Sequence, residues 1–455
     1  MFFRDALINY SRKLQSNAST TGKPKPKAAP ASSTLDTSHI NPYKRIVHAI
    51  HTGEGMTHGP SHLSMWIPFF VQAGVDFVVI VRNRDLFNWV IREFPYVDVV
   101  YAKTPQDIEN VFLSLPVLKA IYYISNTGNL IHSLRFNDYQ HIFLGHGDSD
   151  KTASAHKFFR VYDQVWVAGQ AHIDRFANTG FNTAHMEFVK IGRPTLANVI
   201  KLTDSDWRQR PLHFLYLPTW EGVYEEGNYS SVTLAAQMLQ HLATTYNAPV
   251  TTKFHPVTGS RNKMLANVNT DVQKVLEQTG VEFAIANRLT PVSDLLLNAN
   301  IFICDISAVV SECIAANGPI FVYIPQDKEI KIAKSNMDYN YYAYTFSTLE
   351  ELYSQLEQVL NGNDYKAQAR QEAREYLLGK TQTQNDEFIA QVQAISQSVI
   401  DSLNNPLRDE NAQENAQEQV TEQAQVASKE TTSPTLNSKN DTYVNPQVEV
   451  RERTN

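Results

Sequence analysis

The sequence predicts an α/β protein with two doubly wound domains that face each other across a crevice, and with disordered tails. Short apolar strands alternate with helical stretches in two successive runs, and the pattern pauses at residues 192–194. Polar or cationic residues follow the strands in four places. Continuous runs of Val, Ile and Phe are typical of a parallel sheet covered on both faces. Ligands of such sheets bind at the carboxyl ends of the strands.

The first run lies in an expected domain at residues 45–195. Its apolar segments have the length of strands and occupy residues 45–51, 77–81, 97–101, 120–124, 142–144 and 165–167. Helical patterns at 63–73 and 84–93 lie between the early strands, as the crossover connections of parallel strands require.

The second run lies in an expected domain at residues 196–382. Strands are predicted at 212–217, 249–254, 281–284, 301–304 and 320–324, and helices at 231–245, 260–279 and 349–361. A closing helix is expected at 383–403. The same alternation of strand and helix therefore predicts a second parallel sheet.

The two ends of the chain lack this pattern. Residues 1–44 begin with an amphipathic stretch and continue as a flexible linker rich in Pro, Lys, Ala and Ser. Two interpretations stay open for this start: a peripheral contact with an anionic membrane, and a frayed helix with a tether. Residues 404–455 are acidic and rich in Gln and Asn, so we expect a disordered tail that buries too little apolar surface to fold.

Composition excludes several classes of protein. The chain has 455 residues and a net charge of −7, and it has no basic stripe of the kind that binds nucleic acid. Its only cysteines, Cys304 and Cys313, are too few for a disulfide framework and fit a reducing cytoplasm. No apolar run approaches the ~20 residues of a membrane span. The start is too polar for a secretory signal.

The most informative segment is 293–325. A strand ends at Cys304, Asp305 and Ser307 follow, and a short helical pattern then begins. Free backbone N–H groups at a helix N-terminus favour anions, so we predict a phosphate site at this point. The alternative is that Asp305 or Ser307 only caps the helix.

His146 follows another buried strand. It lies between two glycines, which leave the imidazole accessible, and a histidine in such a place suits a catalytic base. The alternative is a histidine that bonds locally within a turn.

Lys253 and His255 lie at the end of the strand predicted at 249–254. They flank Phe254, so in an extended chain both point to one side, where they suit a diphosphate. The alternative is a solvated sheet edge. Pro218 and Thr219 end the strand at 212–217 and complete the set of polar strand ends.

Three histidines, His51, His58 and His62, gather after the first strand. They invite a metal interpretation, but the loop is rich in glycine and no matching ligand group lies nearby in the sequence. We therefore favour a loop that faces the substrate.

These motifs, in this order, resemble those of the CDP-glycerol glycerophosphotransferases, which make teichoic acids and related capsule polymers. The family's HG-T-P-x-K type loop is matched by HGDSDK at 146–151, its A-P-T-W-R type strand end by LPTW at 217–220, and its R/K-x-H-P segment by KFHP at 253–256. Its L-L-x-x-A-D and D-Y-S-S-x-x-x-D elements are matched by LLNAN at 296–300 and DISAVVSE at 305–312. The resemblance covers residues 140–330 and implies a GT-B fold with two Rossmann-like domains, for acceptor and nucleotide donor.

The chain departs from the family pattern at several positions. Glu221 replaces an Arg, Ala308 replaces the second Ser, Glu312 replaces the closing Asp, and Arg193 precedes Pro194 where the family usually has the reverse order. Losing the Arg at 221 removes a possible phosphate contact, so a donor such as CDP-ribitol stays open.

The resemblance implies transfer of glycerol phosphate from CDP-glycerol to a hydroxyl of a glycan or polyol-phosphate acceptor, lipid-linked or free, with release of CMP. His146 would act as the base, and His255 with Lys253 would neutralise the diphosphate. The full set of expected donor-binding residues is Gly147, Asp148, Ser149, Lys151, Arg193, Pro218, Thr219, Lys253, Asp305, Ser307, Ala308 and Glu312.

Two alternatives come from other classes: a GT-B sugar transferase or UDP-sugar epimerase, and a non-catalytic partner subunit. We expect no tightly bound cofactor, and dependence on Mg²⁺ stays open because no carboxylate pair demands it. The expected location is the cytoplasm, at the inner face of the bacterial cell membrane.

Overall fold

The computed structural model of the chain describes residues 34–147, 149–380 and 384–404. The expected membrane contact of the start, the expected disordered tail and the donor-binding role of Asp148 therefore fall on residues that lie largely or wholly outside this range. Contacts divide the chain into two units, residues 1–393 and 394–455. The first unit contains both sheets and all the described helices except the end of the last one.

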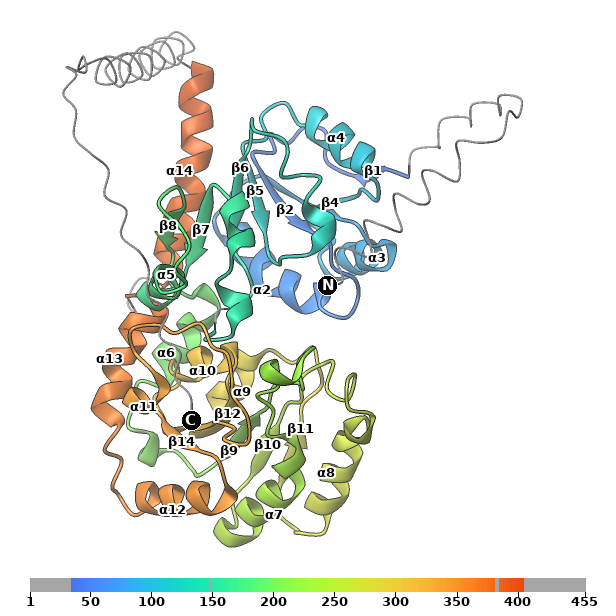
Figure 1. Cartoon of the computed structure of the whole chain (residues 1–455). Coiled ribbons are helices and arrows are strands. Elements are labelled where there is room, and N and C mark those ends of the chain that lie inside the picture. Colours follow the sequence, from blue (N-terminus) through green and yellow to red (C-terminus); the bar gives the residue numbers. More distant parts are fainter. Residues whose placement is uncertain (1–33, 148, 381–383, 405–455) are drawn as a thin grey trace, which may run out of the picture. The chain divides into compact units, whose positions relative to one another are not determined.

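The first unit contains an eight-stranded sheet in the order β1-β4-β3-β2-β5-β6-β7-β8 (Figure 1). Its strands are β1 (Asp36–His39), β2 (His48–Thr52), β3 (Phe77–Val81), β4 (Asp98–Tyr101), β5 (Ala120–Tyr123), β6 (Gln140–Phe143), β7 (Gln164–Val167) and β8 (Glu187–Lys190). Every pairing is parallel except that of β1 with β4. The helices of this half are α2 (Gly59–Gln72), α3 (Arg84–Glu93), α4 (Pro105–Leu113) and α5 (Gln170–Ala177).

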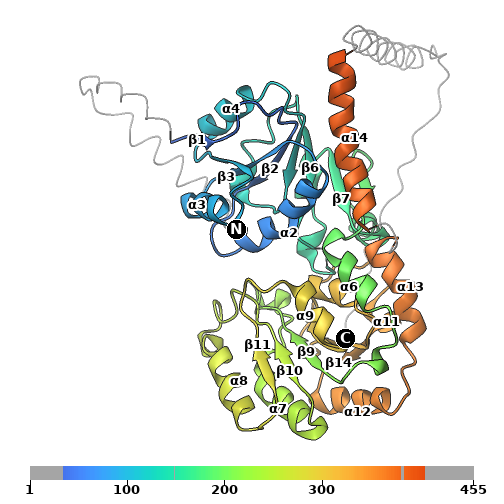
Figure 2. The same ribbon diagram turned by 180° about the vertical axis from the view of Figure 1, so that it is seen from behind.

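A second, six-stranded sheet has the order β11-β10-β9-β12-β13-β14, and all its pairings are parallel. Its strands are β9 (Phe214–Leu217), β10 (Val250–Thr252), β11 (Phe283–Ile285), β12 (Ile301–Asp305), β13 (Ile320–Tyr323) and β14 (Tyr344–Phe346). The helices are α6 (Ala197–Leu202), α7 (Ala235–Tyr246), α8 (Val268–Glu277), α9 (Val292–Asn298), α10 (Ala308–Cys313), α11 (Tyr339–Tyr342) and α12 (Leu349–Leu360). Helices α7 and α8 lie side by side next to β10 and β11 (Figures 1 and 2).

Two closing helices, α13 (Ala367–Leu378) and α14 (Gln384–Asn404), return to the first sheet. The Tyr376 hydroxyl of α13 donates a hydrogen bond of 2.6 Å to Asp174 of α5. Phe388 of α14 lies with its ring centroid 5.5 Å from that of Trp66 and 5.9 Å from that of Trp166. The end of the chain therefore completes the core of its beginning.

The structure confirms the fold class, with two parallel sheets in a mixed α/β arrangement. The continuous apolar run of β3 is buried along its whole length. Helix α3 begins where the sequence places it because the Asn83 side chain accepts a hydrogen bond of 2.9 Å from the Leu86 N–H.

Some elements differ from the prediction. Strand β1 lies inside the segment taken as a linker, and it pairs with β4 although Asp36–His39 contains no aliphatic residue. Strands β8 and β14 and helices α4, α5 and α13 were not predicted. The helix expected at 260–279 spans only Val268–Glu277.

Candidate active site

A cavity of about 790 Å³ opens where the carboxyl ends of strands from both sheets converge. The first sheet contributes the segments that follow β2, β5 and β6, and the second sheet those that follow β9, β10 and β12. Of the residues that the sequence assigned to a site, these line it: His146, Gly147, Ser149, Lys151, Pro218, Thr219, Lys253, His255, Ser307, Ala308 and Glu312.

His146 presents its imidazole to this cavity from the loop after β6. The Nδ1–H donates a hydrogen bond of 3.0 Å to the Ile124 carbonyl, so Nε2 is left with a lone pair. His146 is exposed to solvent on its cavity side, but desolvation by the protein around the ring lowers its pKa, and the neighbouring His62 acts in the same direction. The ring is therefore neutral at pH 7, which is the state a general base needs.

The glycines on either side of His146 have positive φ angles of 65° at Gly145 and 146° at Gly147. A Cβ atom at residue 147 would lie 2.9 Å from Nη2 of Arg193 and 3.0 Å from the Ala308 side chain. Glycine is therefore required for both the backbone conformation and the close approach of the two halves at this loop.

The histidines after β2 join His146. His58 is the N-cap residue of α2 and His62 lies one turn later, so both project from the same side of the helix. The His62 ring stacks on that of His146 at 3.8 Å between centroids, with 8° between the ring planes. The His58 ring lies 6.3 Å from that of His255. His58 and His62 therefore contact two histidines that line the cavity, but His51, His58 and His62 do not line it themselves.

Lys151 and Lys253 bring positive charge to the same cavity. Lys151 donates a hydrogen bond of 2.6 Å from Nζ to the Thr219 hydroxyl, and burial lowers its pKa to about 8. Lys253 donates from Nζ to the Thr290 carbonyl at 2.6 Å, and burial lowers its pKa as well. A pKa of about 8 leaves Lys151 mostly protonated at pH 7, and the two amino groups together can attract a diphosphate.

His255 lines the same cavity, and Lys151, His58, His62 and His146 are among the groups that influence it. Its ring stacks on Trp220 with 6.1 Å between centroids, and burial lowers its pKa to about 3. Phe254 packs into the core of the second sheet, as the alternation of the extended segment predicts.

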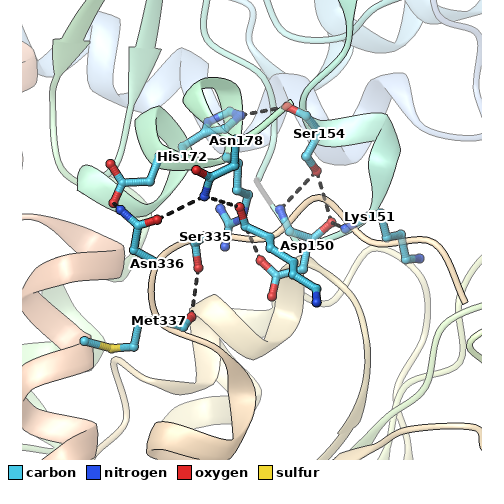
Figure 3. A network of polar contacts seen from close by, with 12 residues as sticks. Asp150, Lys151, Ser154, His172, Asn178, Ser335, Asn336 and Met337 are labelled. Carbon is cyan, nitrogen blue, oxygen red and sulfur yellow. Dashed lines mark hydrogen bonds and ion pairs between the residues drawn. The ribbon is translucent and has the colours of Figure 1, made fainter. Parts of the chain in front are cut away.

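Polar contacts hold the loop that carries Ser149 and Lys151 (Figure 3). Arg175 of α5 donates from Nε to Asp150 at 2.6 Å, and the Ala333 N–H donates to the Asp150 carbonyl at 2.6 Å. His172 bonds from Nε2 to the Ser154 carbonyl at 2.8 Å. The loop is therefore fixed by residues of both halves before any ligand binds.

Asp305 does not line the cavity, in contrast to the donor-binding role expected for it. It is completely buried and accepts hydrogen bonds from the Thr219 N–H at 2.8 Å and from the Ser231 hydroxyl at 2.5 Å. Burial raises its pKa to about 7. Asp305 therefore joins the ends of β9 and β12 and supports Thr219 from behind.

Arg193 also lies behind the cavity wall, although the sequence assigned it to the donor. Its Nη2 donates to the His146 carbonyl at 2.8 Å and to Glu312 at 3.3 Å. It thus connects the His146 loop to α10.

Ser307 is the N-cap residue of α10, but its side chain makes no capping hydrogen bond. Its hydroxyl donates instead to the Asp305 carbonyl at 3.2 Å. Because α10 has only six residues, its dipole adds less to a phosphate site than the sequence pattern implied.

Glu221, which replaces the family's Arg, is 3% exposed and does not line the cavity. It accepts hydrogen bonds from the Gly259 N–H at 2.9 Å and the Asn262 N–H at 3.2 Å. Glu221 therefore has a structural role outside the cavity, and its replacement of the family's Arg is no reason to expect a different donor.

Several residues that line the cavity were not predicted from the sequence. Ser125, Asn126 and Thr127 follow β5 and line the cavity together with Ser61 and Ser64 of α2. The rule that found His146, polar residues after an apolar strand, would also have found the first three. Ser61 was missed because the helix was predicted to start at residue 63 instead of Gly59, whereas Ser64 lies inside the predicted helix, where no local pattern marks it as a site residue.

Among the described residues, no group of three or more His, Cys, Asp or Glu side chains is placed to hold a metal ion. A search of the same residues for helices long and apolar enough to cross a membrane gave none.

Comparison of the fold with solved structures gives the wall teichoic acid polymerase TagF, with 11% sequence identity and a TM-score of 0.52 over 81% of this chain and 91% of that one. A TagF variant soaked with CDPG matches with 10% identity and a TM-score of 0.52, over 81% and 91% of the two chains. A putative UDP-N-acetylglucosamine 2-epimerase from Listeria monocytogenes matches with 10% identity and a TM-score of 0.50, over 78% and 97%. At these identities the likeness shows the fold, which is of the GT-B type.

Comparison with curated protein sequences gave no match. The family model of CDP-glycerol:poly(glycerophosphate) glycerophosphotransferase, in contrast, matches residues 138–391, which is more than half of the chain. That range includes every cavity residue from His146 to Glu312. The chain therefore belongs to the CDP-glycerol:poly(glycerophosphate) glycerophosphotransferase family.

Proposed function

We propose that this chain transfers glycerol phosphate from CDP-glycerol to a hydroxyl of a glycan or polyol-phosphate acceptor, with release of CMP. One observation carries the proposal. A neutral imidazole, that of His146, faces the same cavity as the cationic side chains of Lys151 and Lys253. A base for the acceptor and positive charge for the diphosphate are the two requirements of this reaction.

In the proposed reaction the acceptor oxygen attacks the phosphorus that carries glycerol. A new P–O bond forms, the P–O bond to CMP breaks, and the electron pair of that bond leaves with the CMP phosphate. The acceptor proton passes to Nε2 of His146. Lys151 and Lys253, which line the cavity together with His255, offset the charge that grows on the leaving phosphate.

The acceptor would occupy the wall near His146, where Ser61, Ser64, Ser125, Asn126 and Thr127 present hydroxyl and amide groups. Such groups suit the hydroxyls of a glycan or a polyol. The family membership supports synthesis of a cell-surface polymer of the teichoic acid type.

A donor screen tests the proposal. Purified protein would be incubated separately with CDP-glycerol, CDP-ribitol and UDP-N-acetylglucosamine, with a glycerol-phosphate oligomer or a disaccharide as acceptor, and the released nucleotide measured. We expect CMP from CDP-glycerol, and more of it when acceptor is present. Release of UDP alone would indicate a sugar transferase, and no release from any donor a non-catalytic subunit. Running each assay with Mg²⁺ and with a chelator determines whether a metal ion contributes.

A further inference from the structure

The loop after β2 places the Glu54 carboxylate at the cavity wall, next to His62. Glu54 is 9% exposed, and both of its oxygens lie within hydrogen-bond distance of Nδ1 of His62, at 2.9 and 3.0 Å. When the Nδ1–H donates to Glu54, Nε2 of His62 carries no proton. Glu54 thus fixes the tautomer and the orientation of the ring that stacks on His146 at 3.8 Å.

The negative charge of an ionised Glu54 is opposite to the positive charge that His146 acquires when it takes up a proton. Two stacked imidazoles cannot both become cationic without strong repulsion, so only one of them can hold a proton at a time. Burial raises the pKa of Glu54, while the nearby His146 and His58 lower it. The other carboxylate of the cavity wall, Glu312, already pairs with Arg193 at 3.3 Å. Glu54 is therefore the anion best placed to balance an imidazolium at His146.

The charged and titratable groups around His146 come from several elements, and they include both signs. They are Glu54 after β2, His58 and His62 of α2, Arg193 after β8, His255 after β10 and Glu312 of α10. The cationic member, Arg193, opposes protonation of His146, which makes a compensating carboxylate more important.

We propose that Glu54 and His62 form a positioning pair for the reaction: Glu54 holds His62 as the ring that packs on His146, and its negative charge stabilises the imidazolium that His146 becomes. The inference rests on the proposed function and assigns residues outside the matched range 138–391. When the acceptor proton passes to Nε2 of His146, the His146 ring becomes cationic, Glu54 stays ionised, and His62 stays neutral. No proton moves to Glu54.

The test separates charge from shape. Glu54→Gln keeps an oxygen that accepts from Nδ1–H of His62 but removes the charge, and we expect kcat to fall about 10- to 100-fold with the KM for CDP-glycerol changed less than about twofold. Glu54→Ala opens a space beside the cavity. Acetate should restore a large part of its kcat, whereas acetamide, which has the same shape without the charge, should not.

Asp98→Asn is the matched control. Asp98 is a buried carboxylate of β4 that pairs with Lys44 at 2.5 Å and does not line the cavity, so its loss should destabilise the fold without lowering kcat or responding to acetate. Normal kcat in Glu54→Gln, or equal rescue of Glu54→Ala by acetate and acetamide, would overturn the inference alone. A wild-type protein that releases no CMP would overturn the proposed function, and this inference with it.

Discussion

At the scale of single residues, His146 and His255 carry the same side chain in opposite surroundings. His146 is held by the Ile124 carbonyl and packs against His62, on the side where the acceptor is proposed to bind. His255 stacks on Trp220 and feels the positive charge of Lys151. The first suits proton transfer and the second the diphosphate.

This difference predicts two kinetic phenotypes. His146→Ala should lower turnover at least about a hundredfold and leave the affinity for CDP-glycerol largely intact, because a base acts mainly in the transition state. His255→Ala should weaken donor binding as well as rate, because the diphosphate is present before the reaction. Calorimetric titration with CDP-glycerol and measurement of CMP release would check both.

His213→Ala serves as the control for these variants, since His213 bonds to Thr251 and does not line the cavity. If His146→Ala turns over normally, the base is another group. If His255→Ala binds the donor with unchanged affinity, His255 does not contact the diphosphate.

Residue roles could be predicted from the sequence only where position on a strand decides them. His146, Lys253 and His255 follow apolar strands, and that pattern is enough to bring them to one edge. Asp305 and Arg193 lie at equivalent places, yet both are directed into the protein, by Ser231 and Glu312 respectively. Those partners are 74 and 119 residues away in sequence, so no local sequence pattern predicts these contacts.

At the scale of elements, Glu221 fixes the turn that follows β10. Two backbone N–H groups of this turn, those of Gly259 and Asn262, donate to the same buried carboxylate. Gly259 has a φ of 79°, and a Cβ there would lie 2.6 Å from the Ala266 backbone, so the turn has little room to rearrange.

Glu221→Ala should therefore leave two N–H groups without their acceptor and lower the free energy of unfolding by roughly 1–3 kcal/mol. The urea midpoint of the circular dichroism signal measures this effect. Glu226→Ala, at an exposed position five residues away, is the control and should leave the midpoint within error. Equal midpoints for the two variants would show that the Glu221 contacts contribute nothing to stability.

Element types were largely predictable because the long apolar strands and amphipathic helices repeat their pattern, whereas element ends depend on single residues. Helix α2 begins four residues earlier than predicted because Pro60 favours the first turn of a helix. That shift moves His58 and His62 from a loop to a helix face and brings them to His146. Strand β1 was missed because an edge strand needs no apolar run.

At the scale of the whole molecule, buried histidines connect stability to pH. His48 and His51 are completely buried in β2, and burial lowers their pKa values to about 3 and about 4. In the unfolded chain the same side chains titrate near 6.5. As the pH falls below 6.5, the unfolded state therefore binds protons at these histidines and the folded state does not, which favours unfolding.

Each of these two histidines should reduce the free energy of unfolding by about 1.4 kcal/mol per pH unit between pH 6.5 and 4. Burial lowers the pKa of His62 and His255 as well, and these add to the effect. The raised pKa values of Asp305 and Glu54 act in the opposite sense over part of this range, but these two carboxyls do not offset four histidines.

Thermal midpoints at pH 7.5, 6.5 and 5.5 would test this, and we expect a decrease between the last two. His51 is completely buried, and its Nε2 has no hydrogen-bond partner among the described residues. The variant His51→Leu lacks one titrating group, so its thermal midpoint should fall less between pH 6.5 and 5.5 than that of the wild type. A midpoint that stays constant from pH 7.5 to 5.5 would contradict the prediction.

The return of the last helix to the first sheet has a consequence for synthesis on the ribosome. The ring of Phe388 contacts Trp66, Phe70 and Trp166, which are translated more than two hundred residues earlier. A nascent chain that has just completed β8 therefore lacks the side chain that covers this aromatic group. The aromatic side chains that Phe388 covers in the complete protein therefore stay without this cover while the second sheet is translated. The core of the first half closes only when nearly the whole described chain has emerged.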